Sequence, residues 1–230
     1  MSGPAVKGCW LLVLLALCGN AHALDVIDLR TPIDVAGNAQ AGKDKSATCA
    51  ACHGTEGIAM VPLYPNLAGQ PAAYLYWQLV AYKKAARPDS VMTPMVATLE
   101  DGDMRDLAAY YASLPADMAP ATPPAPVDAD VVARGETLFQ HGDASRGVPP
   151  CQGCHGSDAR GVGAAYPAWP HLRGQQAMYL TQKLQKYHGG QDIDSTQDRI
   201  MQGVARSLDA NDIAALSAYL AGLIPPASSP

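Results

Sequence analysis

The pattern of hydrophobic and polar residues predicts helices throughout the chain, and no stretch shows the convincing alternation that strands require. The predicted helices cover residues 44–52, 71–84, 129–140 and 176–188, and two closing helices begin near residues 100–103 and 209–212. Pro71 lies where a first helical turn accepts proline, and the acidic residues at the start of the closing helices suit helix N-termini. The predicted fold class is therefore all-α.

The same order of elements occurs twice, because the chain is a tandem duplication. With an offset of 105, the segment YPNLAGQ at residues 64–70 lies over WPHLRGQ at residues 169–175. With an offset of 109, residues 92–114 lie over residues 201–223 without a gap. Each repeat thus contains a CxxCH box, a Pro-Gly-Gln turn, a helix, a methionine and a closing helix.

A proline-rich segment separates the two repeats. Residues 115–128 contain five prolines, which prevent helix formation and favour an extended, fairly stiff connector. We therefore expect a first domain over residues 24–114, a linker over 115–126, a second domain over 127–224, and a C-terminal tail over 225–230.

The N-terminus has the pattern of a secretory signal peptide. Lys7 precedes an apolar run over residues 9–17, and small residues flank His22 at Ala21 and Ala23. The run is too short for a comfortable membrane span. We expect a signal peptide over residues 1–23 and a mature protein that is exported to the periplasm.

Composition narrows the function classes. The chain is 48% hydrophobic, yet much of this fraction is alanine and the chain has a single Phe, so a group other than aliphatic side chains could fill its interior. The formal net charge is −5 and neither half has a basic run. A nucleic-acid partner is therefore not expected.

Two five-residue boxes contain the candidate chemistry, CAACH at residues 49–53 and CQGCH at residues 151–155. Cys9 and Cys18 lie in the predicted signal, so the boxes contain all the cysteines of the mature chain. Three interpretations compete: a zinc site, a thiol-disulfide exchange site, and covalent haem with the histidine as an axial ligand of the iron.

Two arguments favour haem. A zinc site of four thiolates would require both boxes to converge across the linker and would leave the two histidines unexplained. Thiol-disulfide exchange is expected in a fold that alternates strands and helices, which this chain lacks. We predict two haem c groups, attached through four cysteines and ligated by two histidines: Cys49, Cys52 and His53 in the first box, and Cys151, Cys154 and His155 in the second.

The repeat also selects the second axial ligand of each iron. Composition leaves several methionines open in the first repeat, but Met92 superimposes on Met201, whereas Met95 falls on Val204. We predict Met92 and Met201 as the thioether ligands, both in loops that precede the closing helices. The alternative is that both are core methionines.

Other repeated and unrepeated residues receive different interpretations. Pro65 and Pro170 are repeated, and a backbone carbonyl at either could accept the proton on the far nitrogen of the ligating histidine. The alternative is that these prolines only shape a turn. His171 and His188 have no histidine counterpart in the other repeat, and we interpret them as ordinary surface or loop residues.

The chain resembles the cytochrome c4 family, dihaem cytochromes made of two fused class I cytochrome c domains. The motifs that carry the resemblance are CAACHG, YPNLAGQ, VMTPM and DMRDLAAYY, with the counterparts CQGCHG, WPHLRGQ, RIMQGV and DIAALSAYL. The resemblance implies His/Met ligation at each iron, haems that face each other across the domain interface, and a periplasmic carrier that is often peripherally attached to the membrane. The chain departs from the family mainly in its long N-terminal extension and its proline-rich linker.

The resemblance also implies a function. Such proteins pass single electrons from a quinol-oxidising complex, a quinol:cytochrome c reductase, or from a periplasmic dehydrogenase toward a terminal oxidase, and outer-sphere transfer needs no catalytic residue. One alternative is a dihaem enzyme, a peroxidase or a thiosulfate-oxidising cytochrome, although two methionine ligands would leave neither iron open. Another is a dedicated cytochrome subunit of a larger oxidoreductase.

Overall fold

The computed structural model describes residues 28–29, 34–116, 126–163, 166, 168–193 and 195–223. The predicted signal peptide, most of the predicted linker and the C-terminal tail lie outside the described residues. None of the helices in the described residues is long and apolar enough to cross a membrane.

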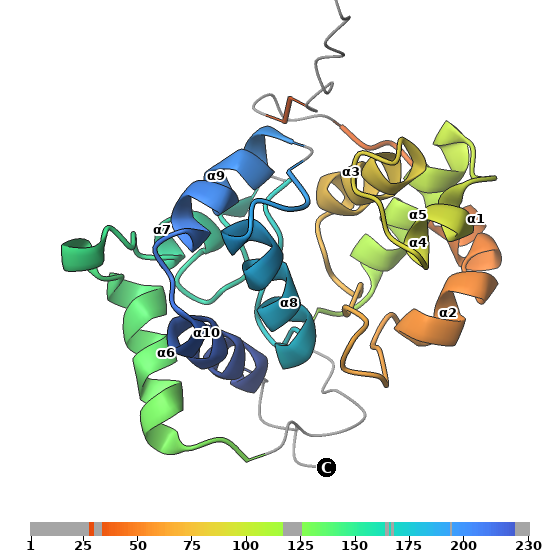
Figure 1. The fold of residues 1–230 in the computed structure, drawn as a ribbon. Coiled ribbons are helices and arrows are strands. Elements are labelled where there is room, and N and C mark those ends of the chain that lie inside the picture. The colour runs from red at the N-terminus through yellow and green to blue at the C-terminus, as the bar shows by residue number, and fades with distance from the viewer. Residues whose placement is uncertain are drawn as a thin grey trace, which may run out of the picture.

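The described residues form two groups of helices (Figure 1). The first unit contains α1 (Ala39–Lys45), α2 (Ala47–His53), α3 (Ala72–Lys83), α4 (Met92–Val96) and α5 (Asp101–Ser113). The second unit contains α6 (Ala129–His141), the short 3-10 helix η1 (Ala144–Arg146), α7 (Gln152–His155), α8 (Ala177–His188), α9 (Thr196–Ala205) and α10 (Ala210–Gly222). The described residues contain no strand, and the all-α prediction is confirmed.

In each unit the first and last helices cross at close range, and a glycine makes this approach possible. A Cβ atom on Gly42 of α1 would lie 2.0 Å from the carbonyl oxygen of Asp106 in α5. A Cβ atom on Gly135 of α6 would lie 2.1 Å from the carbonyl oxygen of Ala215 in α10. Since only glycine lacks this atom, both crossings depend on it.

Each unit has its own small hydrophobic core. In the first unit α3 packs against α5, and in the second unit α6 and α8 pack against α10. The centres of the two cores are formed by buried residues from these helices: Leu75, Val80, Met104 and Leu107 in the first, and Leu138, Phe139, Leu180 and Leu216 in the second.

Two predicted local features were wrong. The expected helix over residues 44–52 is two helices, α1 and α2, that meet at Ser46. The Ser46 hydroxyl donates to the Lys43 carbonyl at 2.7 Å, which gives the backbone an alternative to continued helix. Met92 and Met201 lie in helices α4 and α9 and not in loops, because the chain turns helical before the closing helix begins.

Candidate functional site

The first CxxCH box occupies helix α2, which presents its histidine to the interior. His53 is the last helical residue, and Gly54 ends the helix with a φ of 78°. The His53 side chain is buried, and its Nδ1 lies 2.9 Å from the Pro65 carbonyl oxygen. Because a carbonyl can only accept, this hydrogen bond places the proton on Nδ1 and leaves the Nε2 lone pair available to a metal.

The second box has the same arrangement. His155 ends α7 and Gly156 follows it with a φ of 77°. The buried His155 ring places Nδ1 3.2 Å from the Pro170 carbonyl oxygen. Burial lowers the pKa of both box histidines, since it disfavours the charged form. Both rings are thus neutral at pH 7 and suited to ligation.

The four cysteines of the two boxes are not joined in disulfides, so all four sulfur atoms are available for attachment to a haem. The described residues contain no group of three or more His, Cys, Asp or Glu side chains that could hold a metal ion. The two boxes therefore do not converge on one site. The zinc interpretation would require them to do so.

The methionines of the first unit lie in different environments. Met104 is buried in the core and Met60 is 71% exposed, whereas Met92 is half-buried at the start of α4. The Asp89 carboxylate accepts hydrogen bonds from the backbone N–H groups of Met92, at 2.8 Å, and Val91, at 2.9 Å. This carboxylate therefore fixes the N-terminus of the helix at the residue the repeat selects.

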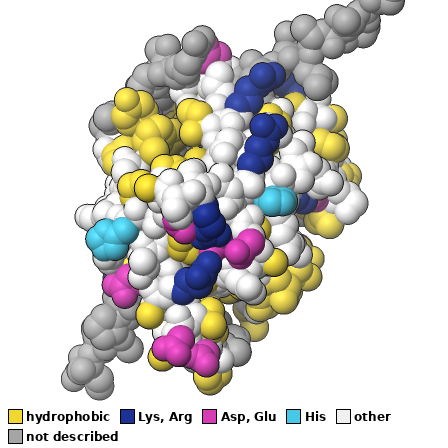
Figure 2. All heavy atoms as spheres, turned by 60° about the vertical axis from the view of Figure 1, so that its left-hand side comes forward, with side chains coloured by type: hydrophobic (Ala, Val, Ile, Leu, Met, Phe, Trp, Pro, Cys, Tyr) yellow, Lys and Arg dark blue, Asp and Glu magenta, His cyan; other side chains and the backbone are white. Residues whose placement is uncertain are grey.

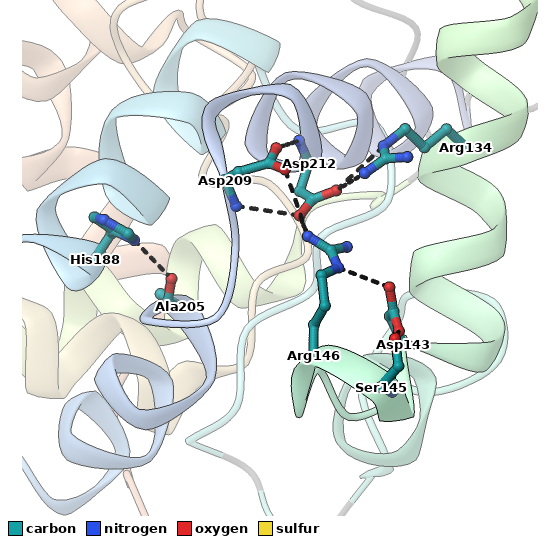
Figure 3. Close-up of polar contacts among 8 residues, drawn as sticks. All are labelled: Arg134, Asp143, Ser145, Arg146, His188, Ala205, Asp209 and Asp212. Carbon is teal, nitrogen blue, oxygen red and sulfur yellow. Dashed lines mark hydrogen bonds and ion pairs between the residues drawn. The ribbon is translucent and has the colours of Figure 1, made fainter.

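In the second unit the half-buried Met201 lies in the middle of the longer helix α9. Helix α8 holds α9 at two places: the Tyr187 hydroxyl donates to Asp198 at 2.6 Å, and His188 Nδ1 donates to the Ala205 carbonyl at 2.9 Å. Figure 3 shows the second of these contacts. His188 is exposed, as the sequence suggested, but it also fastens the C-terminal end of the methionine helix.

The closing helix of the second unit begins at a fully buried carboxylate. Asp212 accepts the backbone N–H of Asp209 at 3.1 Å, and Asp209 accepts the N–H of Asp212 at 2.8 Å, which forms a capping box. The Asp212 carboxylate also pairs with Arg134 of α6 and Arg146 of η1 (Figure 3). The loop between α6 and α7 thus contributes an arginine to the start of α10.

A reciprocal pair of glutamines joins the two units. The Gln70 side chain accepts from the His171 N–H at 3.0 Å and donates to the His171 carbonyl at 2.7 Å. The Gln175 side chain does the same with Asn66, at 2.8 and 3.0 Å. Gln70 and Gln175 are equivalent in the repeat, as are Asn66 and His171. The interface is therefore built as a two-fold pair would be.

His171 is more than an ordinary surface or loop residue. Its backbone is part of this interface, and its ring Nδ1 is buried with no hydrogen-bond partner among the residues that the structure describes. Burial lowers the pKa of this ring. The sequence offered no signal for this role, because the position is asparagine in the first repeat.

A buried cluster of cations lies between α3 and α8, which face each other (Figure 1). The Asp192 carboxylate lies 3.6 Å from Arg87 Nε, 3.2 Å from Lys183 Nζ and 3.3 Å from Lys186 Nζ. Arg87 is only 5% exposed. Three cations thus surround one carboxylate, and buried charge is costly unless it is paired. The cluster fits a group that brings further carboxylates, as haem does.

The sequence did not predict this cluster. Arg87 is far from Lys183 and Asp192 in the chain, and the comparison of repeats finds only residues that both units share. Burial lowers the pKa of Lys183, and the Arg87 charge acts in the same direction. The Asp192 and Asp198 carboxylates act in the opposite direction.

Exposed apolar side chains border both methionine segments. Val91 precedes Met92 and Ile200 precedes Met201, and both are exposed at equivalent positions of the repeat.

On the face drawn in Figure 2, Lys and Arg side chains run in a broken stripe with carboxylates beside it and hydrophobic groups at its margins. This face is mixed in charge, so it suits a partner that docks through apolar contact and local charge pairs.

Comparisons with known proteins agree with this geometry. The family model described as cytochrome c matches residues 39–115 and 132–223. Cytochrome c4 of Pseudomonas aeruginosa is 39% identical over 213 residues, which cover 93% of this chain and 96% of that protein. The crystal structure of reduced recombinant cytochrome c4 from Pseudomonas stutzeri superimposes with a TM-score of 0.73 at 37% identity, covering 82% of this chain and all of that one.

Other relatives are named as electron acceptors of an enzyme and not as cytochrome c4. A thiosulfate dehydrogenase electron acceptor of Thiomonas intermedia is 38% identical over 151 residues, which cover 65% of this chain and 67% of that protein. The relatives of both classes are proteins that accept or carry electrons.

Proposed function

Because this chain belongs to the cytochrome c4 family and is a dihaem electron carrier, we propose that each CxxCH box and one methionine ligate one iron. Cys49 and Cys52 hold the first haem c, with His53 and Met92 on its iron. The second haem c uses the equivalent residues of the second unit: Cys151 and Cys154 hold the group, and His155 and Met201 ligate the iron.

The observation that carries this proposal is the histidine hydrogen bond that occurs in both units. Nδ1 of His53 lies 2.9 Å from the Pro65 carbonyl, and Nδ1 of His155 lies 3.2 Å from the Pro170 carbonyl. A metal-ligating histidine commonly donates its other N–H to such a group, which fixes the ring and raises its basicity. Pro65 and Pro170 therefore act through their carbonyls on the two proposed ligands.

Haem bound at these residues supplies a one-electron couple between ferric and ferrous iron, with a potential that a methionine ligand raises. The chain's own groups prepare that site. His53 and His155 are buried and neutral, and the interdomain cations Arg87 and Lys183 offset the carboxylates of the haems. Shielding by protein limits the reorganisation of solvent when charge changes.

The donor and acceptor are redox proteins of the cell envelope. The N-terminal signal pattern supports a periplasmic carrier, and family resemblance supports transfer from a quinol:cytochrome c reductase or a dehydrogenase to a terminal oxidase, with peripheral attachment to the membrane. The similarity to a thiosulfate dehydrogenase electron acceptor favours a second candidate, in which a thiosulfate dehydrogenase is the donor.

Substitution of the two methionines tests the ligand assignment. We expect Met92→Ala and Met201→Ala each to remove about half of the ferric band near the red end of the visible spectrum that is attributed to the Fe–S(Met) bond, and to lower one of the two potentials in a redox titration. Met95→Ala and Met178→Ala, which remove exposed methionines, are the matched controls. An unchanged band in both ligand variants would show that the assignment is wrong.

A donor assay separates the two candidate functions. Purified protein would be mixed with a reduced quinol:cytochrome c reductase or with a thiosulfate dehydrogenase and its substrate, and haem reduction followed by stopped-flow absorbance. Fast reduction by only one of the two enzymes identifies the class of donor.

A further inference from the structure

Leu29 of the N-terminal extension contacts both units. The Leu29 side chain is only 8% exposed and belongs to the hydrophobic core of the first unit, where Leu75 and Val80 of α3 also lie. The Leu29 backbone N–H donates to Thr196 Oγ1 at 3.0 Å, and its carbonyl accepts from Gln197 Nε2 at 2.6 Å. The side chain thus belongs to one unit, and both backbone groups bind the other.

The contacted residues are the first two of α9. Thr196 lies five residues before Met201, which is roughly 7.5 Å along a helix axis at 1.5 Å per residue. The neighbouring Ser195 already caps the helix, because its side chain accepts from the Asp198 N–H at 3.1 Å. The N-terminal end of α9 is therefore capped by a residue of its own unit, and Leu29 adds a link from the first unit to the same helix end.

Helix α9 is also fastened from within its own unit. Tyr187 and His188 of α8 bind Asp198 and the Ala205 carbonyl, and these contacts hold α9 against α8. A movement of α9 away from α8 would break them, and it would also pull Thr196 away from Leu29. The position of the Met201 helix is thereby coupled to the core of the first unit.

We propose that Leu29 is a positioning residue: it anchors the N-terminal segment in the core of the first unit and, through Thr196 and Gln197, holds the helix that presents Met201 to the second haem. This inference rests on the proposed ligand role of Met201. The extension thus ties the stability of one haem unit to the methionine ligation of the other.

The test uses the holoprotein with both haems and imidazole, which competes with methionine for ferric iron. The double variant Thr196→Val/Gln197→Leu removes both hydrogen-bonding groups from α9 and leaves the Leu29 side chain unchanged. Two hydrogen bonds of ordinary strength make the methionine-detached form of the second haem about five- to 150-fold more populated when they are lost. Imidazole should therefore bind the second haem about that much more tightly, with the first haem unaffected.

Two variants serve as controls. Arg199→Gln changes an exposed residue of the same helix and should leave the imidazole affinity of both haems unchanged. Leu29→Ala should loosen Met201 as well as destabilise the first unit, whereas Leu79→Ala, which removes a side chain packed against the same core, should destabilise the first unit without changing imidazole binding at the second haem. NMR signals of the two ligated methionine methyl groups assign each effect to its haem.

Two results bear on different claims. Equal imidazole affinities in the double variant and the parent protein would overturn the positioning role of Leu29. If Met201→Ala leaves the Fe–S(Met) band intact, the ligand assignment fails instead. The link to Leu29 is then judged by amide hydrogen exchange. The double variant should lower the protection of the α9 amides, and Arg199→Gln should leave it unchanged.

Discussion

The two units contain the same elements in the same order, yet they fasten their methionine helices differently. In the first unit α4 is one short helix, held at its start by Asp89 and near its end by Lys83, which donates to the Ala97 carbonyl at 3.0 Å. In the second unit α9 is twice as long, and α8 and Leu29 both hold it.

The closing helices differ in the same direction. In the first unit Asp103 pairs with Lys45 at 2.8 Å on a partly exposed surface. In the second unit the equivalent Asp212 is fully buried between Arg134 and Arg146. The two units thus share the proposed ligands but differ in the contacts that surround them. We expect the second unit to keep its methionine more firmly than the first.

The largest expected effect comes from the buried carboxylate. Asp212→Asn keeps the shape of the side chain but removes its charge, which takes from Arg134 the carboxylate it pairs with and leaves Arg146 with Asp143 and Asp209 (Figure 3). We expect a loss of about 2–4 kcal/mol in the unfolding free energy of the second unit at pH 7. The equivalent change Asp103→Asn should destabilise the first unit less, because its carboxylate is in contact with solvent. Denaturant unfolding followed by the haem bands of each unit measures both.

The same pair of variants predicts a dependence on pH. Burial by itself raises the pKa of Asp212, but hydrogen bonds from Arg146 and the Asp209 N–H outweigh it, so the folded-state pKa lies below its ordinary value. The stabilisation is therefore present above about pH 4, where an unfolded Asp is charged, and is lost as the pH falls through the lowered pKa. If the difference between Asp212→Asn and the parent protein persists at pH 2, charge is not its cause.

Repeated residues made much of the fold and of the candidate site predictable. The CxxCH boxes, the Pro-Gly-Gln turns and the acidic starts of the closing helices occur twice, and α3, α5, α6, α8 and α10 begin within a few residues of the predicted positions. Capping and periodicity are local properties, so the sequence displays them directly. The helix break at Ser46 was missed because it depends on one hydroxyl that competes with the backbone.

Residues without a counterpart in the other repeat could not be found in this way. Leu29 and Arg87 act through partners in the other unit, and no periodic pattern marks a contact between segments more than 90 residues apart. The reciprocal contacts of Gln70 and Gln175 are an intermediate case. Their repetition was visible, but their partners became apparent only in the structure.

A smaller effect is expected at the N-terminal ends of the two methionine helices. Asp89→Ala removes the acceptor of two N–H groups in α4, and such a loss costs about 1–2 kcal/mol. Ser195→Ala removes one such acceptor in α9. Because α9 has further fastenings, imidazole should displace the methionine of the first haem about tenfold more readily in Asp89→Ala, and that of the second haem less than tenfold in Ser195→Ala. Larger effects in Ser195→Ala would reverse the comparison between the units.

The smallest effect is expected at the C-terminal ends of α4 and α9. One side chain in each unit, a lysine in the first and a histidine in the second, donates a hydrogen bond to a backbone carbonyl there. Lys83→Met removes the donor to Ala97, and His188→Ala removes the donor to Ala205. Each loss of one hydrogen bond should make the corresponding methionine about two- to fivefold easier to displace by imidazole. His188→Gln, which retains a donor, should restore most of the parent affinity. If it behaves as His188→Ala does, packing of the ring, and not its hydrogen bond, holds the end of α9.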